Sequence, residues 1–167
     1  MSREVERTED GRHIVVDGRR WRASDPAIDD DVRAELVREL MAARRAVGAG
    51  SRSSDEDAVA SARRRVQDAK VALGERGRAW WEPPDDEAIV ERAVATALAL
   101  GRARGAAGES AGEVAHGEVV RVAARGPSTS SSVREALDGH RDLTAVDAGG
   151  GSAGDRRYRV EPSPGGS

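Results

Sequence analysis

"GEVVRVAARGPSTSSSVREAL", residues 117–137, is the stretch on which the fold of the C-terminal half depends. Two apolar runs are separated by Gly126, Pro127 and a series of hydroxyl side chains. Proline has no backbone N–H and a fixed φ, so it ends a helix or stands at the beginning of one. The stretch therefore predicts two helices joined by a turn, with the second helix beginning near Ser132.

The beginning of that second helix has a purely structural interpretation. Ser132 and Glu135 are spaced as in the S-x-x-E capping box, in which the two side chains satisfy free amides at a helix N-terminus. Such a cap requires no ligand.

The sequence on either side of this stretch extends the pattern. A helix is expected upstream, in "EAIVERAVATALALGRARG", and two strands are expected downstream, near Leu143–Val146 and Arg157–Val160. The loop between the strands contains "GGGSAG" (149–154). It lacks the lysine and the strand-then-helix context of a phosphate-binding loop, so we interpret it as the tip of a hairpin.

The order helix, helix, turn, helix, hairpin resembles a winged helix-turn-helix domain. Residues 117–137 and the two strands around "GGGSAGDR" carry the resemblance. It implies that the third helix enters the major groove of DNA. The residues that would then contact DNA are Ser128, Thr129, Ser130, Ser131 and Arg134 on that helix, with Arg156, Arg157 and Arg159 on the wing. Winged helices also serve as protein-binding modules, so double-stranded DNA and a protein partner both stay open.

The N-terminal half begins with a hairpin signal in "RHIVVDGRRWRA" (12–23). Asp17-Gly18 suits the positive φ angles of a type I′ turn. In a two-residue-loop register, His13, Val15, Arg20 and Arg22 share one face, and Ile14, Val16, Arg19 and Trp21 share the other. A lone hairpin is marginal in water, so we expect it to lie across the helices that follow, with Trp80 or Trp81 covering an open end.

Two amphipathic helices follow the hairpin. The first is expected from Asp25 as N-cap to about Val47, and "GAGSRSS" (48–54) is expected to break the chain. The second is expected from Asp55 to about Leu73, with apolar residues spaced three and four apart. Together they predict an antiparallel αα-hairpin.

This N-terminal half resembles a group of small actinobacterial proteins of unknown function. The resemblance covers about residues 11–82 and is carried by "DGRRWRASDPAIDDDVRAELVRELMAARRAV", "ARRRVQDAKVALGERG" and "WWE". Members sometimes carry the label biopolymer transporter Tol, but the periplasmic signal, propeller repeat and membrane segment that such a label implies are not found in the sequence. The resemblance implies an architecture and a bacterial group, with no activity and no catalytic residues.

The fold class expected is therefore mainly α with small β-hairpins: an αα-hairpin with a β-hairpin, followed by a winged-helix-like domain. The expected division is a disordered tail (1–11), a first domain (12–82), a linker at 83–86 within "WEPPDD" (81–86), a second domain (87–161) and a disordered tail (162–167). The two prolines of the linker stop helix and sheet alike.

Composition limits the functional classes. The net charge is −3, and residues 116–160 contain seven arginines against six acidic residues, so no half of the chain is broadly basic. There is no cysteine, no long apolar run and no secretory signal, which predicts a soluble cytoplasmic protein.

No pattern in the sequence indicates catalysis. The three histidines are isolated from one another, no serine lies in a nucleophile elbow, and no metal-ligand spacing occurs. We therefore expect a non-enzymatic binding protein without a cofactor. It would be a transcription-associated DNA-binding protein or, alternatively, a protein–protein adaptor. Arg19, Arg20, Trp21 and Arg22 are candidate partner-binding residues, although such a tryptophan more often packs on nearby helices.

Overall fold

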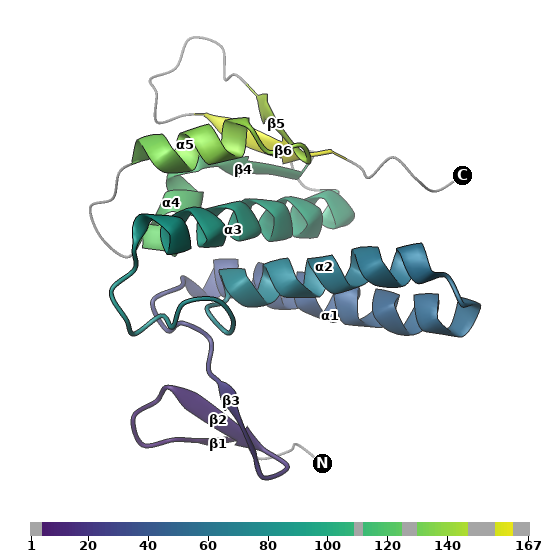
Figure 1. Cartoon of the computed structure of the whole chain (residues 1–167), viewed down its shortest axis with the longest axis vertical. Helices are drawn as coiled ribbons and strands as arrows, with labels where there is room; N and C mark the ends of the chain where they lie inside the picture. Colours follow the sequence, from purple (N-terminus) through teal and green to yellow (C-terminus); the bar gives the residue numbers. More distant parts are fainter. Residues whose placement is uncertain (1–4, 109–111, 125–129, 147–155, 162–167) are drawn as a thin grey trace.

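The structure is a computed structural model that describes residues 5–108, 112–124, 130–146 and 156–161. It is mainly helical with two small antiparallel sheets, which confirms the expected class (Figure 1). The elements, in chain order, are β1 (Glu6–Arg7), β2 (His13–Val16), β3 (Arg19–Arg22), α1 (Asp30–Ser53), α2 (Glu56–Ala72), α3 (Asp86–Ala107), β4 (Glu113–Ala115), α4 (His116–Ala124), α5 (Ser130–Asp138), β5 (Leu143–Val146) and β6 (Arg157–Val160).

The N-terminal hairpin has the predicted turn and register. Asp17 and Gly18 have φ angles of 51° and 74°, and Ile14 is paired with Trp21. One prediction is corrected, because the expected disordered tail contains β1, which adds a third strand beside β2. Thr8 holds this addition: its backbone N–H donates to the carbonyl oxygen of His13 at 2.9 Å, and its hydroxyl donates to Asp10 at 2.6 Å.

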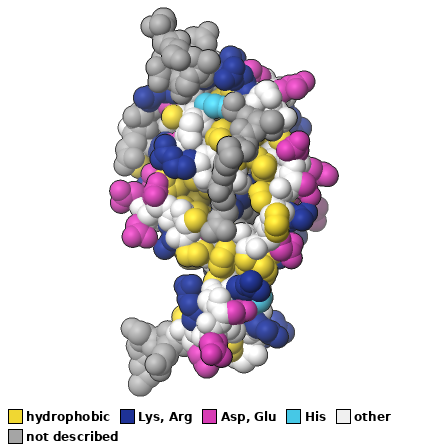
Figure 2. All heavy atoms as spheres, turned by 90° about the vertical axis from the view of Figure 1, so that its left-hand side faces the viewer, with side chains coloured by type: hydrophobic (Ala, Val, Ile, Leu, Met, Phe, Trp, Pro, Cys, Tyr) yellow, Lys and Arg dark blue, Asp and Glu magenta, His cyan; other side chains and the backbone are white. Residues whose placement is uncertain are grey.

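This sheet does not lie across the αα-hairpin as expected. It stands off one end of the helices and forms a separate lobe in the space-filling view (Figures 1 and 2). The lobe is attached through tryptophans of the α2–α3 loop. Trp81 makes an edge contact with the His13 ring at 5.4 Å, and the indole N–H of Trp80 donates to the carbonyl oxygen of Ala23 at 2.9 Å. On the other face of the sheet Ile14 and Val16 are half-buried, and Trp21 is 47% exposed.

Helix α1 is displaced toward the C-terminus relative to the prediction. Asp25 is not its N-cap, since its buried carboxylate accepts from the backbone N–H of Ala27 and pairs with Arg92 at 2.9 Å. At the other end, "GAGSRSS" continues the helix to Ser53. Gly50 lies in the helix because α2 passes close by: a Cβ there would come within 2.9 Å of a Val59 methyl group.

Helix α2 agrees with the prediction to within a residue at each end. The Asp55 side chain caps it by accepting from the backbone N–H of Ala58 at 2.9 Å. A partly buried ion pair joins the two helices of the hairpin, with Arg65 donating to both carboxylate oxygens of the buried Glu39 at 2.7 and 3.0 Å. This bidentate contact raises the pKa of Arg65 and keeps both charges compensated inside the structure.

Helix α3 is the centre of the molecule. It lies between the αα-hairpin on one side and the layer of α5 with β4–β6 on the other (Figure 1). One hydrophobic core includes Leu36 of α1, Leu73 after α2, Leu100 of α3 and Tyr158 of β6. The core is thus continuous across the linker predicted at 83–86. The division of the chain into two domains stays a prediction.

The C-terminal residues form a three-stranded sheet with the order β4-β6-β5. Strands β5 and β6 coincide with the predicted ones, whereas β4 was not predicted from the sequence. Strand β4 pairs with β6 in the register Val114 to Tyr158. Helix α3 packs closely against β6 at Gly101. A Cβ on Gly101 would collide with a Val160 methyl group of β6, so glycine is required for this close packing.

Candidate nucleic-acid interface

Of the four predicted hydroxyl contacts, Ser130 and Ser131 lie at the beginning of α5. Ser128 and Thr129 are outside the described residues, and Ser130 is the first residue of α5. Ser131 is exposed and Arg134 is half-buried. Ser132 is therefore inside the helix and cannot be the N-cap of a capping box, which corrects the structural interpretation of this stretch. Further along α5, the exposed side chains are those of Glu135 and Asp138.

The wing arginines are paired with carboxylates. Arg159 donates to Glu113 of β4 at 2.7 Å, and Arg157 lies 3.8 Å from the other oxygen of the same carboxylate. Arg156 pairs with Asp138 of α5 at 3.2 Å. These three arginines therefore share two carboxylates, which lowers the field that they present to an anion.

The pleat of β6 divides the predicted site. Arg157 and Arg159 lie on one face of the sheet, and Tyr158 points to the other face, into the core. Arg156 and Arg134, by contrast, both act electrostatically on Tyr158 and on His116. The structure brings Arg134 and Arg156 together and leaves Arg157 and Arg159 apart from them.

Asp138 links the groups around Arg134 and Arg156. It accepts a hydrogen bond from the Tyr158 hydroxyl at 3.0 Å and pairs with Arg156. Burial, with this hydrogen bond, raises the pKa of Tyr158 to about 12.

His116, the first residue of α4, is buried beside Tyr158 with the ring centroids 6.2 Å apart. Burial lowers the pKa of His116. The charges of Arg134 and Arg156 lower it further, while Asp138 opposes them. Sequence reasoning missed His116, Tyr158 and Asp138 as site residues. The one available signal was Tyr158, whose place between two arginines of a strand indicates an inward-facing side chain.

The candidate partner-binding residues of β3 have different roles. Arg22 donates to the carbonyl oxygen of Gly77 at 2.8 Å and lies over Trp81, so it attaches the sheet to the body. Arg19 and Arg20 are exposed, and Lys70 lies 5.8 Å from the centroid of Trp21. The structure leaves Arg19, Arg20 and Trp21 accessible from solvent.

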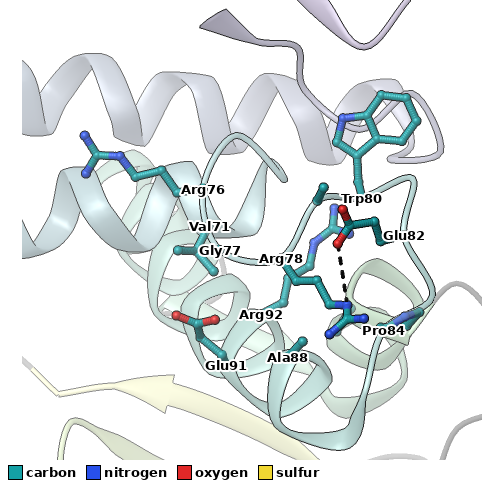
Figure 3. A pocket seen from close by; sticks show the side chains of 12 residues that line it. Val71, Arg76, Gly77, Arg78, Trp80, Glu82, Pro84, Ala88, Glu91 and Arg92 are labelled. Atoms are coloured by element: carbon teal, nitrogen blue, oxygen red, sulfur yellow. Dashed lines mark ion pairs between the residues drawn. The ribbon is translucent and has the colours of Figure 1, made fainter.

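A pocket of ≈ 30 Å³ lies where the α2–α3 loop meets α3 (Figure 3). Arg78, Glu82 and Arg92 extend over it, and Arg78 pairs with Asp85 at 2.6 Å and with Glu82 at 4.0 Å. This volume holds a water molecule and no organic ligand. Its charged groups bind one another, so the pocket is part of the architecture of the loop.

No family model, curated protein or solved structure matches the chain. Within the residues that the structure describes, no three histidine or carboxylate side chains gather as metal ligands. Likewise, no helix in the described part is long and apolar enough to cross a membrane. Function must therefore be argued from the geometry of the surface.

Proposed function

We propose that the chain is a binding protein whose C-terminal unit is a winged-helix-like domain that contacts double-stranded DNA. The observation that carries the proposal is topological. From α3 onward the elements run helix, strand, helix, helix, strand, strand, and the last strand lies between the other two in the sheet. The unpredicted strand β4 completes the three-stranded sheet of the winged-helix pattern. In that pattern α5 is the recognition helix.

The charges on the described surface favour contact through the beginning of α5. Ser131 and Arg134 lie there, with Arg156 close to Arg134, whereas Glu135 and Asp138 make the rest of the helix surface acidic. Recognition helices of helix-turn-helix proteins also contact base edges with their N-terminal residues. On this proposal Arg134 contacts a base edge and Arg156 contacts a phosphate.

Fluorescence anisotropy with labelled genomic duplexes, including the region upstream of the gene, tests this function at two salt concentrations. Affinity should fall steeply with salt, because neutralised phosphates release counterions. Arg134→Ala should lose discrimination between duplexes. Arg156→Ala should weaken all duplexes alike and lower the salt slope by about one. Arg38→Ala, which removes the same charge from the exposed surface of α1, is the control and should leave binding unchanged.

The adaptor alternative rests on a different surface. Trp21 is 47% exposed and lies on one face of the N-terminal sheet, together with Ile14 and Val16. Val5, directly before β1, is 52% exposed. Exposed apolar side chains on a protruding lobe favour a protein partner. If the intact chain binds no duplex at low salt, the DNA proposal fails. A partner whose recovery depends on Trp21 then becomes the expected finding.

A further inference from the structure

Strand β3 is an edge strand of the N-terminal sheet. The strand order β1-β2-β3 places β2 on one side of it and no described strand on the other. The sheet forms the lobe that stands away from the helices (Figures 1 and 2). An edge strand presents a row of N–H and C=O groups with which a further chain can form hydrogen bonds. This edge is therefore a template for an added strand.

The register shows which backbone groups of β3 point outward. In an antiparallel pair of strands, hydrogen-bonded residue pairs alternate with pairs whose backbone groups point away from each other. The backbone N–H of Ala23 donates to the carbonyl oxygen of Arg12 at 2.9 Å, so this pair and every second pair toward the turn are hydrogen-bonded. Arg20 and Arg22 belong to the alternate pairs. Their N–H and C=O groups point to the open edge, and within the described part of the chain they have no backbone partner there.

The side chains of this edge are positively charged. Three of the four residues of β3 are arginines, with Arg20 and Arg22 on one face of the strand and Arg19 beside Trp21 on the other. Arg19 and Arg20 are exposed, and among the described residues neither has a hydrogen bond or an ion pair. Arg22 donates to the carbonyl oxygen of Gly77, which carries no compensating charge. Both faces of the edge therefore attract negative charge.

These charges select the chain that fits the edge. Like charges directly opposite each other in a sheet are unfavourable, whereas opposite charges stabilise the pair. Pairing of β3 with β3 of a second copy would bring arginines against arginines, so the charges oppose that contact. Acidic side chains lie favourably opposite the same arginines. Trp21 is 47% exposed and adds a broad apolar surface on one face. The edge thus fits an acidic extended segment that contains an apolar side chain.

We propose that β3 binds an acidic, extended segment of a partner protein, which adds a fourth strand to the three-stranded N-terminal sheet. In an antiparallel arrangement the segment carries acidic, apolar, acidic and acidic residues in that order, opposite β3 taken from Arg22 back to Arg19. Main-chain hydrogen bonds to Arg20 and Arg22 give affinity, and the side chains give specificity. The inference states the chemistry of the partner in the adaptor alternative. It does not rest on the proposed DNA contact, because the two surfaces share no residue.

A capped peptide of sequence Thr-Glu-Val-Glu-Glu-Thr has this order and serves as the probe. It is titrated into the intact protein, and tryptophan fluorescence and amide hydrogen exchange are followed. Binding should be saturable and should shift the emission to shorter wavelength as the indole of Trp21 leaves water, an effect that is lost in Trp21→Phe. The amide hydrogens of Arg20 and Arg22 should exchange several-fold more slowly in the complex. That of Arg19, already bonded to β2, should change little.

Modified peptides test the geometry and the charges separately. N-methyl groups on the two glutamates opposite Arg20 and Arg22 should abolish binding, because those amides face β3. N-methyl groups on the valine and on the last glutamate face away from β3 and should be tolerated. Replacing all three glutamates with glutamine should weaken binding about tenfold, as expected when three cross-strand charge pairs are lost.

A charge exchange across the edge tests the register. Arg20→Glu should abolish binding of the peptide, and a peptide with lysine in place of the glutamate opposite residue 20 should restore it. This restoration also shows that the variant is folded. Arg45→Glu, on the exposed surface of α1, is the matched control and should bind the original peptide unchanged.

Four results would overturn the inference. They are the absence of saturable binding, equal affinity for the glutamate and glutamine peptides, unchanged exchange at Arg20 and Arg22 in the complex, and tighter binding of a single-stranded oligonucleotide that stacks on Trp21. Self-association of the chain that depends on Arg20 would overturn it as well. The anisotropy experiment with duplexes reports on Arg134 and Arg156, so the DNA proposal stands or fails separately.

Discussion

Tyr158 shows how a single side chain connects the core to the candidate site. Its ring is fully buried in the core, while its hydroxyl donates to Asp138 at the edge of the arginine cluster. Ionisation would place a phenolate next to a carboxylate in a poorly solvated position. The neutral form is therefore strongly favoured in the folded protein.

This preference gives a direct prediction, because Tyr158 is the single tyrosine in the sequence. Absorbance at the tyrosinate band should titrate with a pKa of about 12 in the folded protein, and near 10 in denaturant. Because the folded pKa is raised, the stabilisation is complete below pH 10 and is lost as the pH rises from about 10 to about 12. Tyr158→Phe should remove that pH dependence. A native titration near 10 would mean that the hydroxyl is not buried against Asp138.

Two glycines of α1 illustrate, at the scale of an element, how packing overrides local propensity. Gly50 faces α2, where a Cβ would come within 3.2 Å of the backbone nitrogen of Val59 as well as close to its methyl group. At Gly48 the nearest atom is the end of the flexible Arg52 side chain, at 3.4 Å. One glycine is required by the helix pair and the other is not.

Alanine substitutions should separate these two cases. Gly50→Ala should destabilise the protein by about 1–3 kcal/mol, because the backbone of α2 cannot move away cheaply. Gly48→Ala should stabilise it by about 0.5–1 kcal/mol, since alanine loses less backbone entropy than glycine in a helix interior. Urea unfolding of the two variants measures both effects. Equal shifts of the midpoint for the two would contradict the close approach at Gly50.

The contrast between local sequence pattern and tertiary packing explains which elements could be predicted from the sequence. Strands β5 and β6 and helix α2 have local patterns, with β-prone residues, an Asp cap and regular apolar spacing, that agree with the final structure. The end of α1 contains glycine and serine residues typical of a break, and the helix persists there because α2 packs against it. Strand β4 is three residues long and depends on β6, which is distant in sequence.

The candidate site was predictable only in part, for a similar reason. Arg134 and Arg156 could be identified from the helix and the wing, but nothing local indicated that Arg157 and Arg159 share Glu113 on the other face of the sheet. His116 had no motif around it. It belongs to the cluster because α4 begins directly after β4 and so places residue 116 against β6, through its backbone bond to the carbonyl oxygen of Arg156 at 2.8 Å.

At the scale of the whole molecule, ion pairs of α3 reinforce the continuous core. Arg104 donates to Glu35 of α1 at 2.7 and 3.1 Å and to Glu118 of α4 at 2.7 and 2.9 Å. Arg102 pairs with Asp68 of α2 at 2.6 Å. The αα-hairpin and the C-terminal unit are thus connected through one helix, by apolar contacts and by charge-assisted hydrogen bonds.

This connection predicts a single cooperative unfolding transition. All three tryptophans lie between residues 21 and 81, whereas His116 lies in the C-terminal unit, so tryptophan fluorescence and the His116 NMR signal report on opposite sides of α3. In urea, both probes should show the same midpoint.

Arg104→Ala should lower the free energy of unfolding by about 2–4 kcal/mol, because it leaves two mostly buried carboxylates uncompensated. Arg45→Ala, on the exposed surface of α1, should change it by less than about 0.5 kcal/mol. Separate midpoints for the two probes in the unsubstituted protein would instead mean that the hairpin and the C-terminal unit unfold independently and that the shared core contributes little to their coupling.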